Sequence, residues 1–300
     1  MPKTGYITIV GRPNAGKSTL LNALIGEKVS AISHRPQTTQ RTIPGILTDE
    51  SRGYQMVFLD TPGVHEFTKE QFGSQKSHDI HERINSEAFA SLHQADIVLR
   101  LLDPTRAYGS EDEKIDSLLE EIGKPIIRIE TKQDLENKSY PQKGVDIRID
   151  STTRAGFGAL LEKIFEFLPE GDFLYPPEYY TDQSMDLRIT EVIREQLFLE
   201  LGEEVPYACF VQVTQIEEKG GTPDKPHPML SIQAYINVET ESQKVIVIGK
   251  GGKKIGEIGL KSRIILEEIF GKKIFLALRV KVARNWRKDE RVLNKVFPKK

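Results

Sequence analysis

Gly11-Arg12-Pro13-Asn14-Ala15-Gly16-Lys17-Ser18 matches the phosphate-loop pattern G-x-x-x-x-G-K-[ST] and is the strongest indication of the fold. It follows the apolar run Tyr6–Val10 and precedes a helical pattern over Lys17–Leu24. In that setting the glycines let the backbone amides turn toward phosphate oxygens, and the helix presents its positive N-terminal end. We expect Lys17 to reach the β and γ phosphates and Ser18 to ligate Mg²⁺, with Thr19 beside them in the nucleotide site.

The segments around this loop alternate between strand and helix patterns. Further strand-like runs lie at Gln55–Leu59, Ile97–Leu102 and Pro125–Ile129, and each is nearly continuously apolar, as buried parallel strands are. Helical patterns lie at Glu82–Leu92, Glu111–Ile122 and Ala159–Leu168. The alternation predicts a doubly wound α/β P-loop domain with a mostly parallel sheet over residues 1–168.

A second, smaller domain is predicted beyond the first. Pro169-Glu170-Gly171-Asp172 and Pro176-Pro177 indicate a linker over residues 169–184. Residues 185–300 then contain a helical pattern at Asp186–Leu201, strand-like segments at Ala208–Ile216, Leu230–Val238 and Ile274–Val282, and helical turns around Gly249–Gly252. This order predicts an α+β domain.

Two further motifs stand at the carboxyl ends of predicted strands. In Asp60-Thr61-Pro62-Gly63 the Asp60 carboxylate can hold Mg²⁺ through water, and the Gly63 amide can meet a γ-phosphate. In Thr131-Lys132-Gln133-Asp134 the carboxylate of Asp134 offers two acceptors to the ring N–H and exocyclic amine of guanine, which adenine lacks. The pattern therefore favours GTP over ATP, although capping of the next helix would also suit Asp134.

Weaker signals complete the predicted nucleotide site. Ser151-Thr152 follows a short strand at Val145–Ile149, and we expect the Thr152 amide to contact the guanine carbonyl. The polar segment Arg35–Arg41 lies between the first and second motifs. A threonine there can close over the γ-phosphate and complete the Mg²⁺ shell, and a plain loop is the alternative.

The charge of the chain is divided unevenly. Residues 241–300 carry 17 Lys and Arg against 6 Asp and Glu, a net charge of +11, whereas residues 1–240 carry −13. The basic part contains a G-x-x-G turn before a helix, Ile248-Gly249-Lys250-Gly251-Gly252-Lys253-Lys254. Such glycines let the backbone approach a phosphodiester chain while the lysines supply charge, as in KH modules that hold single-stranded RNA. Trp286, near Arg284 and Arg287, could stack on RNA or anchor a helix in the core.

The order and spacing of these motifs, together with Pro36-Gln37-Thr38-Thr39, resemble the Era family of bacterial GTPases. The glycine turn extends the resemblance over nearly the whole chain. The resemblance implies a GTPase domain joined to a type II KH domain, which binds the 3′ region of small-subunit ribosomal RNA and assists assembly of the small ribosomal subunit. It also implies GTP and GDP as ligands, Mg²⁺ as cofactor and Thr39 as its switch ligand. Lys17, Thr39 and Gly63 are then the expected catalytic residues.

Several positions depart from the family pattern. Thr131 replaces the usual Asn, so a shorter hydroxyl takes the place of the amide that braces base and phosphate loop, and weaker guanine binding is expected. Thr152 replaces an Ala at a backbone contact, and Gln40 replaces an Arg. The segment His65–His78 is several residues longer than the family's second switch. Val64 stands where faster relatives have a Gln that orients water, so slow hydrolysis is expected.

Composition is ordinary for a globular chain. No apolar run approaches the roughly 18 to 20 residues that span a bilayer, and the N-terminus lacks a signal-peptide core. A cytoplasmic protein is therefore expected. A monomer is also expected, and peripheral association with the inner face of the cell membrane stays open. The single cysteine, Cys209, lies in an apolar stretch that favours a buried, inert thiol.

Two other functions are compatible with parts of the pattern. The first is a nucleotide-binding RNA scaffold without significant turnover, which Val64 and Thr131 favour. The second is an ATP-dependent RNA remodelling enzyme, which Asp134 argues against. Phosphate release and nucleotide competition distinguish these from a GTPase.

Overall fold

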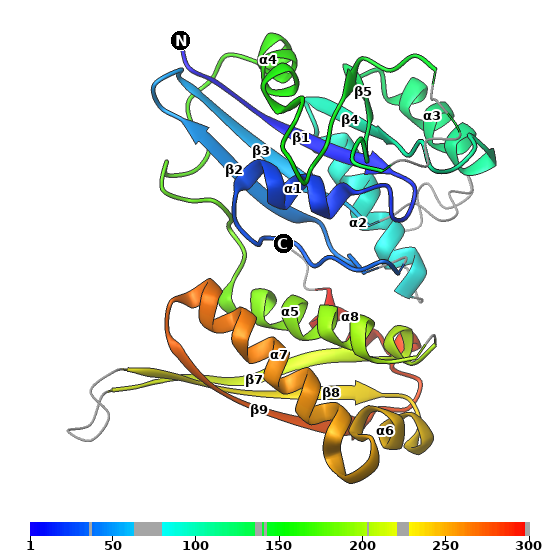
Figure 1. Cartoon of the computed structure of the whole chain (residues 1–300), viewed down its shortest axis with the longest axis vertical. Coiled ribbons are helices and arrows are strands. Elements are labelled where there is room, and N and C mark those ends of the chain that lie inside the picture. Colours follow the sequence, from blue (N-terminus) through cyan, green and yellow to red (C-terminus); the bar gives the residue numbers. More distant parts are fainter. Residues whose placement is uncertain are drawn as a thin grey trace. The chain divides into compact units, whose positions relative to one another are not determined.

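The computed structural model divides into two compact units, which meet in the sequence at Gln183 and Ser184 (Figure 1). It describes the chain except residues 36–37, 63–79, 136–139, 141–142, 203, 221–227 and 298–300, and of residues 81–82 only the backbone. The predicted second-switch segment and the motif residues Gly63 and Val64 therefore lie outside the described residues.

The first unit is built on a six-stranded sheet in the order β2-β3-β1-β4-β5-β6. Its strands are β1 (Lys3–Gly11), β2 (Ile43–Asp49), β3 (Tyr54–Asp60), β4 (Ile97–Leu102), β5 (Ile126–Glu130) and β6 (Ile147–Arg148). β2 runs antiparallel to β3, and the other neighbours are parallel. Every residue of β3 and β4 is buried, which is why their sequences are almost uninterrupted apolar runs.

The strand registers bring the predicted motifs to one edge of this sheet. Ile9 of β1 pairs with Asp60 of β3 on one side and with Leu99 of β4 on the other. Leu102 at the end of β4 pairs with Glu130 at the end of β5. Because these strands are parallel, the loops that follow them lie together, at the edge where open α/β sheets bind ligands.

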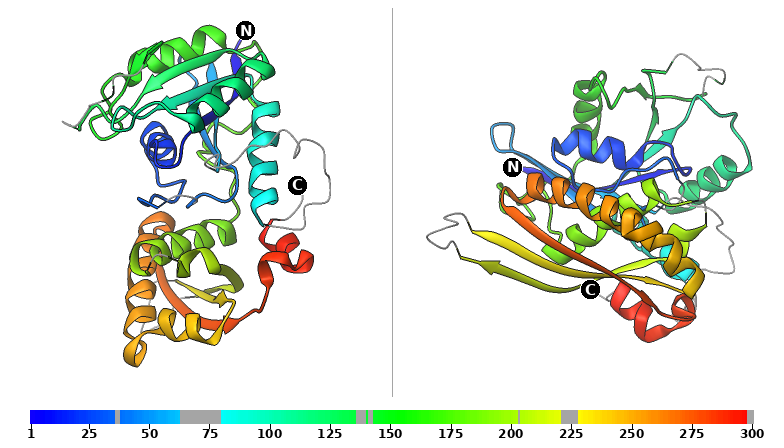
Figure 2. Two further views of the ribbon diagram at one scale, coloured as in Figure 1. Left: turned by 90° about the vertical axis from the view of Figure 1, so that its right-hand side faces the viewer. Right: turned by 60° about the horizontal axis from the view of Figure 1, so that its bottom comes forward.

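Helices cover both faces of the sheet. α1 (Lys17–Ile25) lies on one face and α2 (Ile80–Gln94) on the other (Figure 2). α3 (Ser110–Ile122) joins α2 in an apolar cluster with β1 and β4, and α4 (Phe157–Phe167) follows β6. Each helix coincides within a few residues with a pattern predicted from the sequence.

β2 is the strand that sequence reasoning missed. Pro44 and Gly45 argue against a strand, but β2 is the outermost strand, where a missing backbone N–H is tolerated. Gly45 is required by packing, since a Cβ there would lie 2.6 Å from Cδ1 of Leu21 in α1. Gly45, which argues against a strand in the sequence, therefore lets α1 lie close to the sheet because it has no side chain.

Segment 169–184, predicted to be a linker, runs along the first unit. The carbonyl of Tyr180 accepts a hydrogen bond from the amide of Ile46 in β2 at 2.9 Å. At the end of the segment, Nε2 of Gln183 donates to the carbonyl of Val29 at 3.0 Å. The segment therefore covers part of the exposed edge of β2. The exact bounds of the domains and linker stay predictions.

The second unit contains a three-stranded sheet in the order β7-β8-β9, with β8 antiparallel to β7 and parallel to β9. A pair of helices with the glycine turn between them connects the two parallel strands. The elements in chain order are α5 (Met185–Glu200), η2 (Val205–Ala208), β7 (Phe210–Lys219), β8 (Met229–Val238), α6 (Glu241–Ile248), η3 (Lys250–Gly252), α7 (Lys253–Phe270), β9 (Lys273–Val282), η4 (Trp286–Lys288) and α8 (Glu290–Val296).

The core of the second unit lies between its sheet and helices, and alternate residues of β8 point into it. Trp286 is fully buried, and its indole N–H donates to the carbonyl of Ala208 at 3.0 Å, so it anchors the core and cannot stack on RNA. Cys209 is buried, and burial raises its thiol pKa to about 12, in agreement with an inert thiol. Among the described helices, none is long and apolar enough to cross a membrane.

Candidate functional site

The phosphate loop joins β1 to α1 through a tight turn. Asn14 (φ 63°) and Gly16 (φ 95°) adopt the left-handed conformation, and α1 begins directly afterwards at Lys17. A Cβ on Gly11 would lie 3.1 Å from the carbonyl oxygen of Leu101, so glycine is needed where the loop leaves the sheet. No side chain of the described residues caps α1, and its first amides therefore remain available to an anion.

Lys17 lies inside this loop and is only 7% exposed. Its ammonium group donates to the carbonyls of Gly11 and Arg12, both at 3.1 Å. Burial lowers the pKa of Lys17 to about 8, although the carboxylate of Asp60 opposes this shift. A poorly hydrated ammonium at the base of a phosphate loop is well suited to pair with phosphate oxygens.

Three predicted Mg²⁺ residues meet beside the loop. The Ser18 hydroxyl donates to Oδ2 of Asp60 at 2.6 Å and lies 3.2 Å from the Thr39 hydroxyl. Thr39 lies 3.5 Å from the same carboxylate oxygen. Burial raises the pKa of Asp60, while the bonds from the hydroxyls of Ser18, Ser30 and Thr39 and the charge of Lys17 oppose the shift. Side chains from α1, β3 and the loop before β2 thus form one oxygen-rich cluster.

The predicted base site follows β5 and β6. The Thr131 hydroxyl donates to the carbonyl of Ala15 at 3.0 Å, so it braces the phosphate loop despite being shorter than the expected Asn. Lys132 (φ 56°) donates to Asp103 at 2.6 Å. The Thr152 amide, predicted to contact a guanine carbonyl, donates to Oδ1 of Asp150 at 2.7 Å. Asp134 is exposed and lines the same pocket as Thr152.

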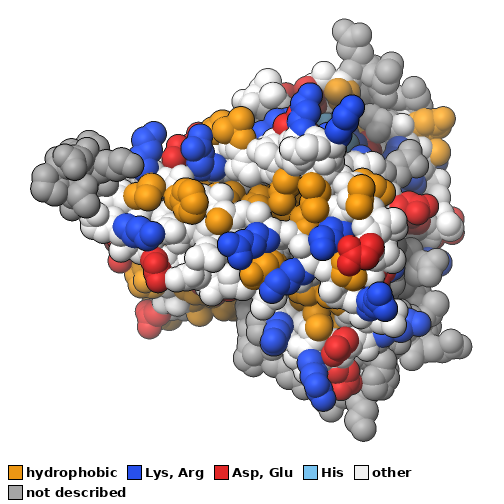
Figure 3. Space-filling view, turned by 90° about the horizontal axis from the view of Figure 1, so that it is seen from below, with side chains coloured by type: hydrophobic (Ala, Val, Ile, Leu, Met, Phe, Trp, Pro, Cys, Tyr) orange, Lys and Arg blue, Asp and Glu red, His pale blue; other side chains and the backbone are white. Residues whose placement is uncertain are grey.

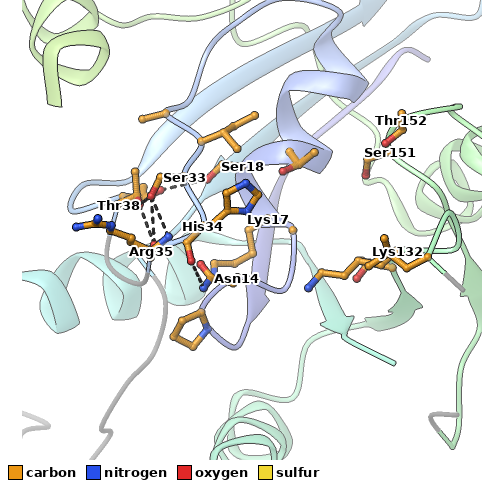
Figure 4. A pocket seen from close by; sticks show the side chains of 18 of the residues that line it. Asn14, Lys17, Ser18, Ser33, His34, Arg35, Thr38, Lys132, Ser151 and Thr152 are labelled. Atoms are coloured by element: carbon orange, nitrogen blue, oxygen red, sulfur yellow. Dashed lines mark hydrogen bonds between the residues drawn. The ribbon is translucent and has the colours of Figure 1, made fainter. Parts of the chain in front are cut away.

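A pocket of about 430 Å³ brings these parts together. In Figure 4 the phosphate-loop residues lie between Ser33, His34, Arg35 and Thr38 on one side and Lys132, Ser151 and Thr152 on the other. The predicted residues that line the pocket are Pro13, Asn14, Gly16, Lys17, Ser18, Thr19, Thr39, Thr131, Lys132, Asp134, Ser151 and Thr152. Its volume lies in the range of small-molecule sites.

Other predicted residues support the pocket without lining it. Asp60 is fully buried behind Ser18, and the Thr61 hydroxyl donates to the carbonyl of Ile9 at 2.8 Å. The remaining members of this group are Gly11, Arg12, Ala15 and Pro62, which are absent from the described pocket lining.

Arg12 is directed away from the predicted phosphate position. Its guanidinium donates to Glu111 at 2.9 Å, to Asp112 at 2.6 Å and to the carbonyl of Ala107 at 2.9 Å. Asp112 also accepts from the fully buried Arg100 of β4 at 2.8 Å. Arg12 therefore ties the phosphate loop to α3, and a direct contact with nucleotide is not what this geometry favours.

Sequence reasoning missed several pocket residues in the loop before β2. The Asn14 amide donates to the carbonyl of His34 at 2.7 Å and so joins this loop to the phosphate loop. The polar composition of segment Arg35–Arg41 indicated that a threonine contacts the nucleotide. It gave no indication that the residues before this segment line the pocket. The additional lining residues are Ala31, Ile32, Ser33, His34, Arg35, Thr38 and Leu135.

The predicted RNA-binding turn is a separate site in the second unit. Gly249 (φ 72°) ends α6, and a Cβ on it would lie 2.6 Å from Cβ of Lys254. Gly251 (φ 61°) and Gly252 (φ 79°) are left-handed, with nothing within 4 Å of an added Cβ. The turn therefore has a compact base at Gly249 and open space over the next two glycines, where another backbone can approach.

The lysines around this turn differ in how freely they could contact a phosphate. Lys250 and Lys253 are exposed, whereas the ammonium of Lys254 lies 3.6 Å from Glu200 and 3.5 Å from Glu257. Ile248 is half-buried at the end of α6. Figure 3 looks onto this unit and shows Lys and Arg side chains interspersed with hydrophobic ones. Such a surface combines attraction for phosphates with apolar contacts for bases.

Comparison with known proteins identifies the family. The family model "50S ribosome-binding GTPase" matches residues 6–132, and the KH domain model matches residues 204–287. GTPase Era of Caldanaerobacter subterraneus subsp. tengcongensis is 37% identical over 305 residues, covering 98% of this chain and 97% of that protein. The chain belongs to the Era family of GTPases. GTPase Era of Borreliella burgdorferi is also 37% identical, over 98% of this chain and 99% of its own length.

Solved Era structures match the fold over its full length. A variant of Aquifex aeolicus Era bound to GDP and AlF4⁻ has a TM-score of 0.85, 33% identity and 99% coverage of both chains. Era in complex with MgGDPNP and nucleotides 1506–1542 of 16S ribosomal RNA has a TM-score of 0.86, with the same identity and coverage. The predicted family, the P-loop GTPase domain followed by a KH domain, and the GTPase activity are confirmed. The roles of individual site residues stay predictions.

Proposed function

We propose that this Era-family GTPase binds GTP or GDP with Mg²⁺ in the pocket of its first unit. We also propose that its second unit binds the 3′ region of small-subunit ribosomal RNA and so assists assembly of the small ribosomal subunit. The observation that carries both proposals is the presence, in one chain, of a phosphate-loop pocket and an open glycine turn in a basic KH domain. An Era of the same fold has been solved with both kinds of ligand.

The nucleotide would occupy the pocket with its phosphates at the loop and its base beyond Thr131. Lys17 would pair with phosphate oxygens, replacing its bonds to loop carbonyls by stronger charge-assisted ones. The carboxylate of Asp134 would accept from the two N–H groups that distinguish guanine from adenine. The phosphates and the base would thus be bound by separate groups of residues in one pocket.

The residues beside the phosphate loop fit Mg²⁺. Ser18, Thr39 and Asp60 supply only oxygen ligands, which this ion prefers. Oδ1 of Asp60 is buried and has no hydrogen-bond partner among the described residues, so it is free to accept from a metal-bound water. When bound, the ion would neutralise charge on the β and γ phosphates. The chain itself holds the phosphates and excludes water around Lys17.

Hydrolysis is proposed to be slow in the free protein. Val64 has no group that could orient an attacking water, and the second motif therefore supplies only the Gly63 amide. A backbone-held water, a cation or a group from a binding partner would complete the arrangement. Phosphate release measured with and without small ribosomal subunits tests this, and equal rates would contradict a partner-supplied group.

RNA binding is proposed to depend on backbone approach and charge together. Gly251 and Gly252 leave open space for a phosphodiester chain, and exposed Lys250 and Lys253 flank it. KH loops of this kind clamp about four nucleotides. The net charge of +11 on residues 241–300 adds attraction that does not depend on sequence.

The decisive experiment compares two RNA oligonucleotides of equal length and composition. One carries the 3′ end of small-subunit ribosomal RNA and the other the same nucleotides in scrambled order, and each is titrated with the full chain in the presence of a GTP analogue. We expect tighter binding of the first, with an affinity that falls with salt by a log–log slope of about −0.7 per phosphate neutralised. Equal binding of both oligonucleotides would contradict recognition of this RNA.

A cytoplasmic location, a monomeric state and an association with the inner face of the membrane stay proposals. Sedimentation of the purified chain tests the oligomeric state. Fractionation of cells at low and high salt tests the location, because a peripheral association would be released by salt.

A further inference from the structure

The Asp60 carboxylate is held by three hydroxyl groups, of which the sequence motifs account for two. Besides Ser18 and Thr39, the hydroxyl of Ser30 donates to Oδ2 of Asp60 at 2.6 Å. This bond is as short as the one from Ser18. Ser30 belongs to neither the phosphate-loop motif nor the threonine pair, and its contact became apparent only in the folded chain.

Ser30 differs from the other two donors in its position. Ser18 and Thr39 line the nucleotide pocket, whereas Ser30 is only 1% exposed and is absent from the described pocket lining. Ser18 and Thr39 must share their oxygens with whatever occupies the pocket. Because Ser30 is buried and lies outside the described pocket lining, its hydroxyl can keep donating to Asp60 while the pocket is filled.

Ser30 is itself fixed by a residue of α1. Oδ1 of Asn22 accepts from the amides of Val29 and Ser30, each at 2.8 Å, and Nδ2 of Asn22 donates to the carbonyl of Ser30 at 2.8 Å. Asn22 lies four residues after Ser18, on the same face of the helix. One helix therefore holds Asp60 twice, directly through Ser18 and indirectly through Asn22 and Ser30.

The two oxygens of Asp60 have contrasting surroundings. Oδ2 takes all three hydroxyl contacts, and Oδ1 is buried without a hydrogen-bond partner among the described residues. Leaving a buried carboxylate oxygen without a donor is unfavourable, and such an atom needs an explanation. A bond from Ser30 to Oδ2 limits the rotation of the carboxylate and so the orientations in which Oδ1 can meet a donor.

We propose that Ser30, held by Asn22, is a positioning residue that fixes the Asp60 carboxylate for the Mg²⁺-dependent part of nucleotide binding. This inference rests on the proposed function, because it requires that the pocket bind a guanine nucleotide with Mg²⁺. Ser30 touches neither ligand and acts only through Asp60. Its loss should therefore alter the dependence of binding on Mg²⁺ while leaving the phosphate-loop contacts intact.

The test measures the affinity of the full chain for a fluorescent GDP derivative over a range of Mg²⁺ concentrations and in excess EDTA. For Ser30→Ala we expect the Mg²⁺ concentration at half-maximal tight binding to rise about tenfold, as loss of a hydrogen bond to a charged group would give. The affinity in EDTA should be unchanged. Asn22→Asp, which keeps the acceptor Oδ1 but loses the donor, should show a smaller shift in the same direction.

Thr42→Val is the matched control. Thr42 lies in the same loop before β2 and also carries a hydroxyl, but it is absent from the described pocket lining, and its hydroxyl lies 2.6 Å from that of Ser91. It should leave the Mg²⁺ dependence unchanged. If Ser30→Ala lowers the affinity equally in EDTA and in Mg²⁺, Ser30 merely supports the pocket and the proposal is overturned.

Two further outcomes separate this proposal from the proposed function. If GDP binding by the unmodified chain depends on Mg²⁺, and GDP binding by Ser30→Ala depends on Mg²⁺ to the same extent, the positioning role alone is overturned. An unmodified chain whose GDP affinity is the same in EDTA and in Mg²⁺ would overturn the metal site, and the positioning role with it. Thermal unfolding of each variant without nucleotide verifies that the fold is retained.

Discussion

The two proposed ligand sites of this chain offer phosphate contrasting surroundings. In the first unit the groups are enclosed: Lys17 is 7% exposed, Thr39 is 6% exposed and Asp60 is fully buried. In the second unit the turn offers the exposed Gly251 beside the exposed lysines Lys250 and Lys253. Enclosed groups bind through a few directional and poorly hydrated contacts. Exposed groups bind through close backbone approach and diffuse charge.

This difference has consequences for specificity and for sensitivity to the medium. Interactions in the enclosed pocket are screened little by salt, and each lost contact leaves an unpaired buried group. Interactions at the open turn are screened strongly, and single charges contribute little. Loss of a charged contact should therefore have a large and localised effect in the first unit, whereas loss of a single charge at the turn should have a smaller, additive effect.

The largest effect is expected for Lys17→Ala. The substitution removes the ammonium that would pair with the β and γ phosphates, and truncating a buried charge pair costs about 2 to 5 kcal/mol. GTP affinity should fall about 100-fold or more, as measured by isothermal titration. Lys163→Ala, which removes a surface lysine paired with Glu166 at 3.4 Å, is the control and should have no effect. Unchanged GTP affinity in the Lys17 variant would show that the phosphate loop is misassigned.

A smaller effect is expected for Asp134→Asn at the base end of the pocket. The amide loses one acceptor for guanine but can donate to the carbonyl that replaces the exocyclic amine in xanthine. GTP affinity should fall about 30-fold, as expected for a hydrogen bond to a charged group, and XTP affinity should rise. Competition against a fluorescent nucleotide measures both. Equal affinity of the unmodified chain for ATP and GTP would contradict base recognition by Asp134.

The open turn is tested by replacing Gly251 and Gly252 together with Asp. Two side chains would be added at left-handed positions, and two carboxylates would repel the RNA backbone where it must approach. RNA affinity should fall about 20-fold in filter binding at physiological salt, while GTP affinity should stay the same. Gly53→Asp is a control with the same left-handed strain in the first unit. Normal RNA binding by the double variant would assign the basic surface to another partner.

The enclosed site should also respond to pH in a way that the open site does not. The pKa of Lys17 is lowered to about 8 in the folded chain, below its unfolded value, so the ammonium is present below pH 8 and is lost as pH rises. Above pH 8, binding GTP requires uptake of a proton, and affinity should fall up to about tenfold per pH unit. By the same linkage, stability of the free protein rises between pH 8 and the unfolded pKa, because the buried charge is removed. A GTP affinity that is constant from pH 7 to 9.5 would contradict this.

Sequence patterns predicted the parts of the molecule that are determined by residues close together in the sequence. Buried strands require continuous apolar runs, and the phosphate loop requires fixed glycine spacing, so both could be found locally. Residues that act through distant partners could not. Gly45 is explained by Leu21, Ser30 by Asp60, and the reduced availability of Lys254 by Glu200. These pairings form only when the chain folds, and the sequence carries no periodicity that marks them.

The smallest effect is expected at Thr131, where the chain departs from its family. The Thr131 hydroxyl donates to the carbonyl of Ala15 at 3.0 Å and lies 3.3 Å from the carbonyl of Leu102, so the brace on the phosphate loop survives the loss of the amide. Thr131→Val keeps the shape but removes this bond, and GTP affinity should fall about threefold. Thr131→Asn restores a side-chain amide, which can brace the phosphate loop with one N–H and offer the second N–H to the nucleotide. GTP affinity should therefore rise by a similar factor. Both are measured by the same titration in excess Mg²⁺. If Thr131→Val binds GTP as the unmodified chain does, the hydroxyl of Thr131 is not a brace for the phosphate loop.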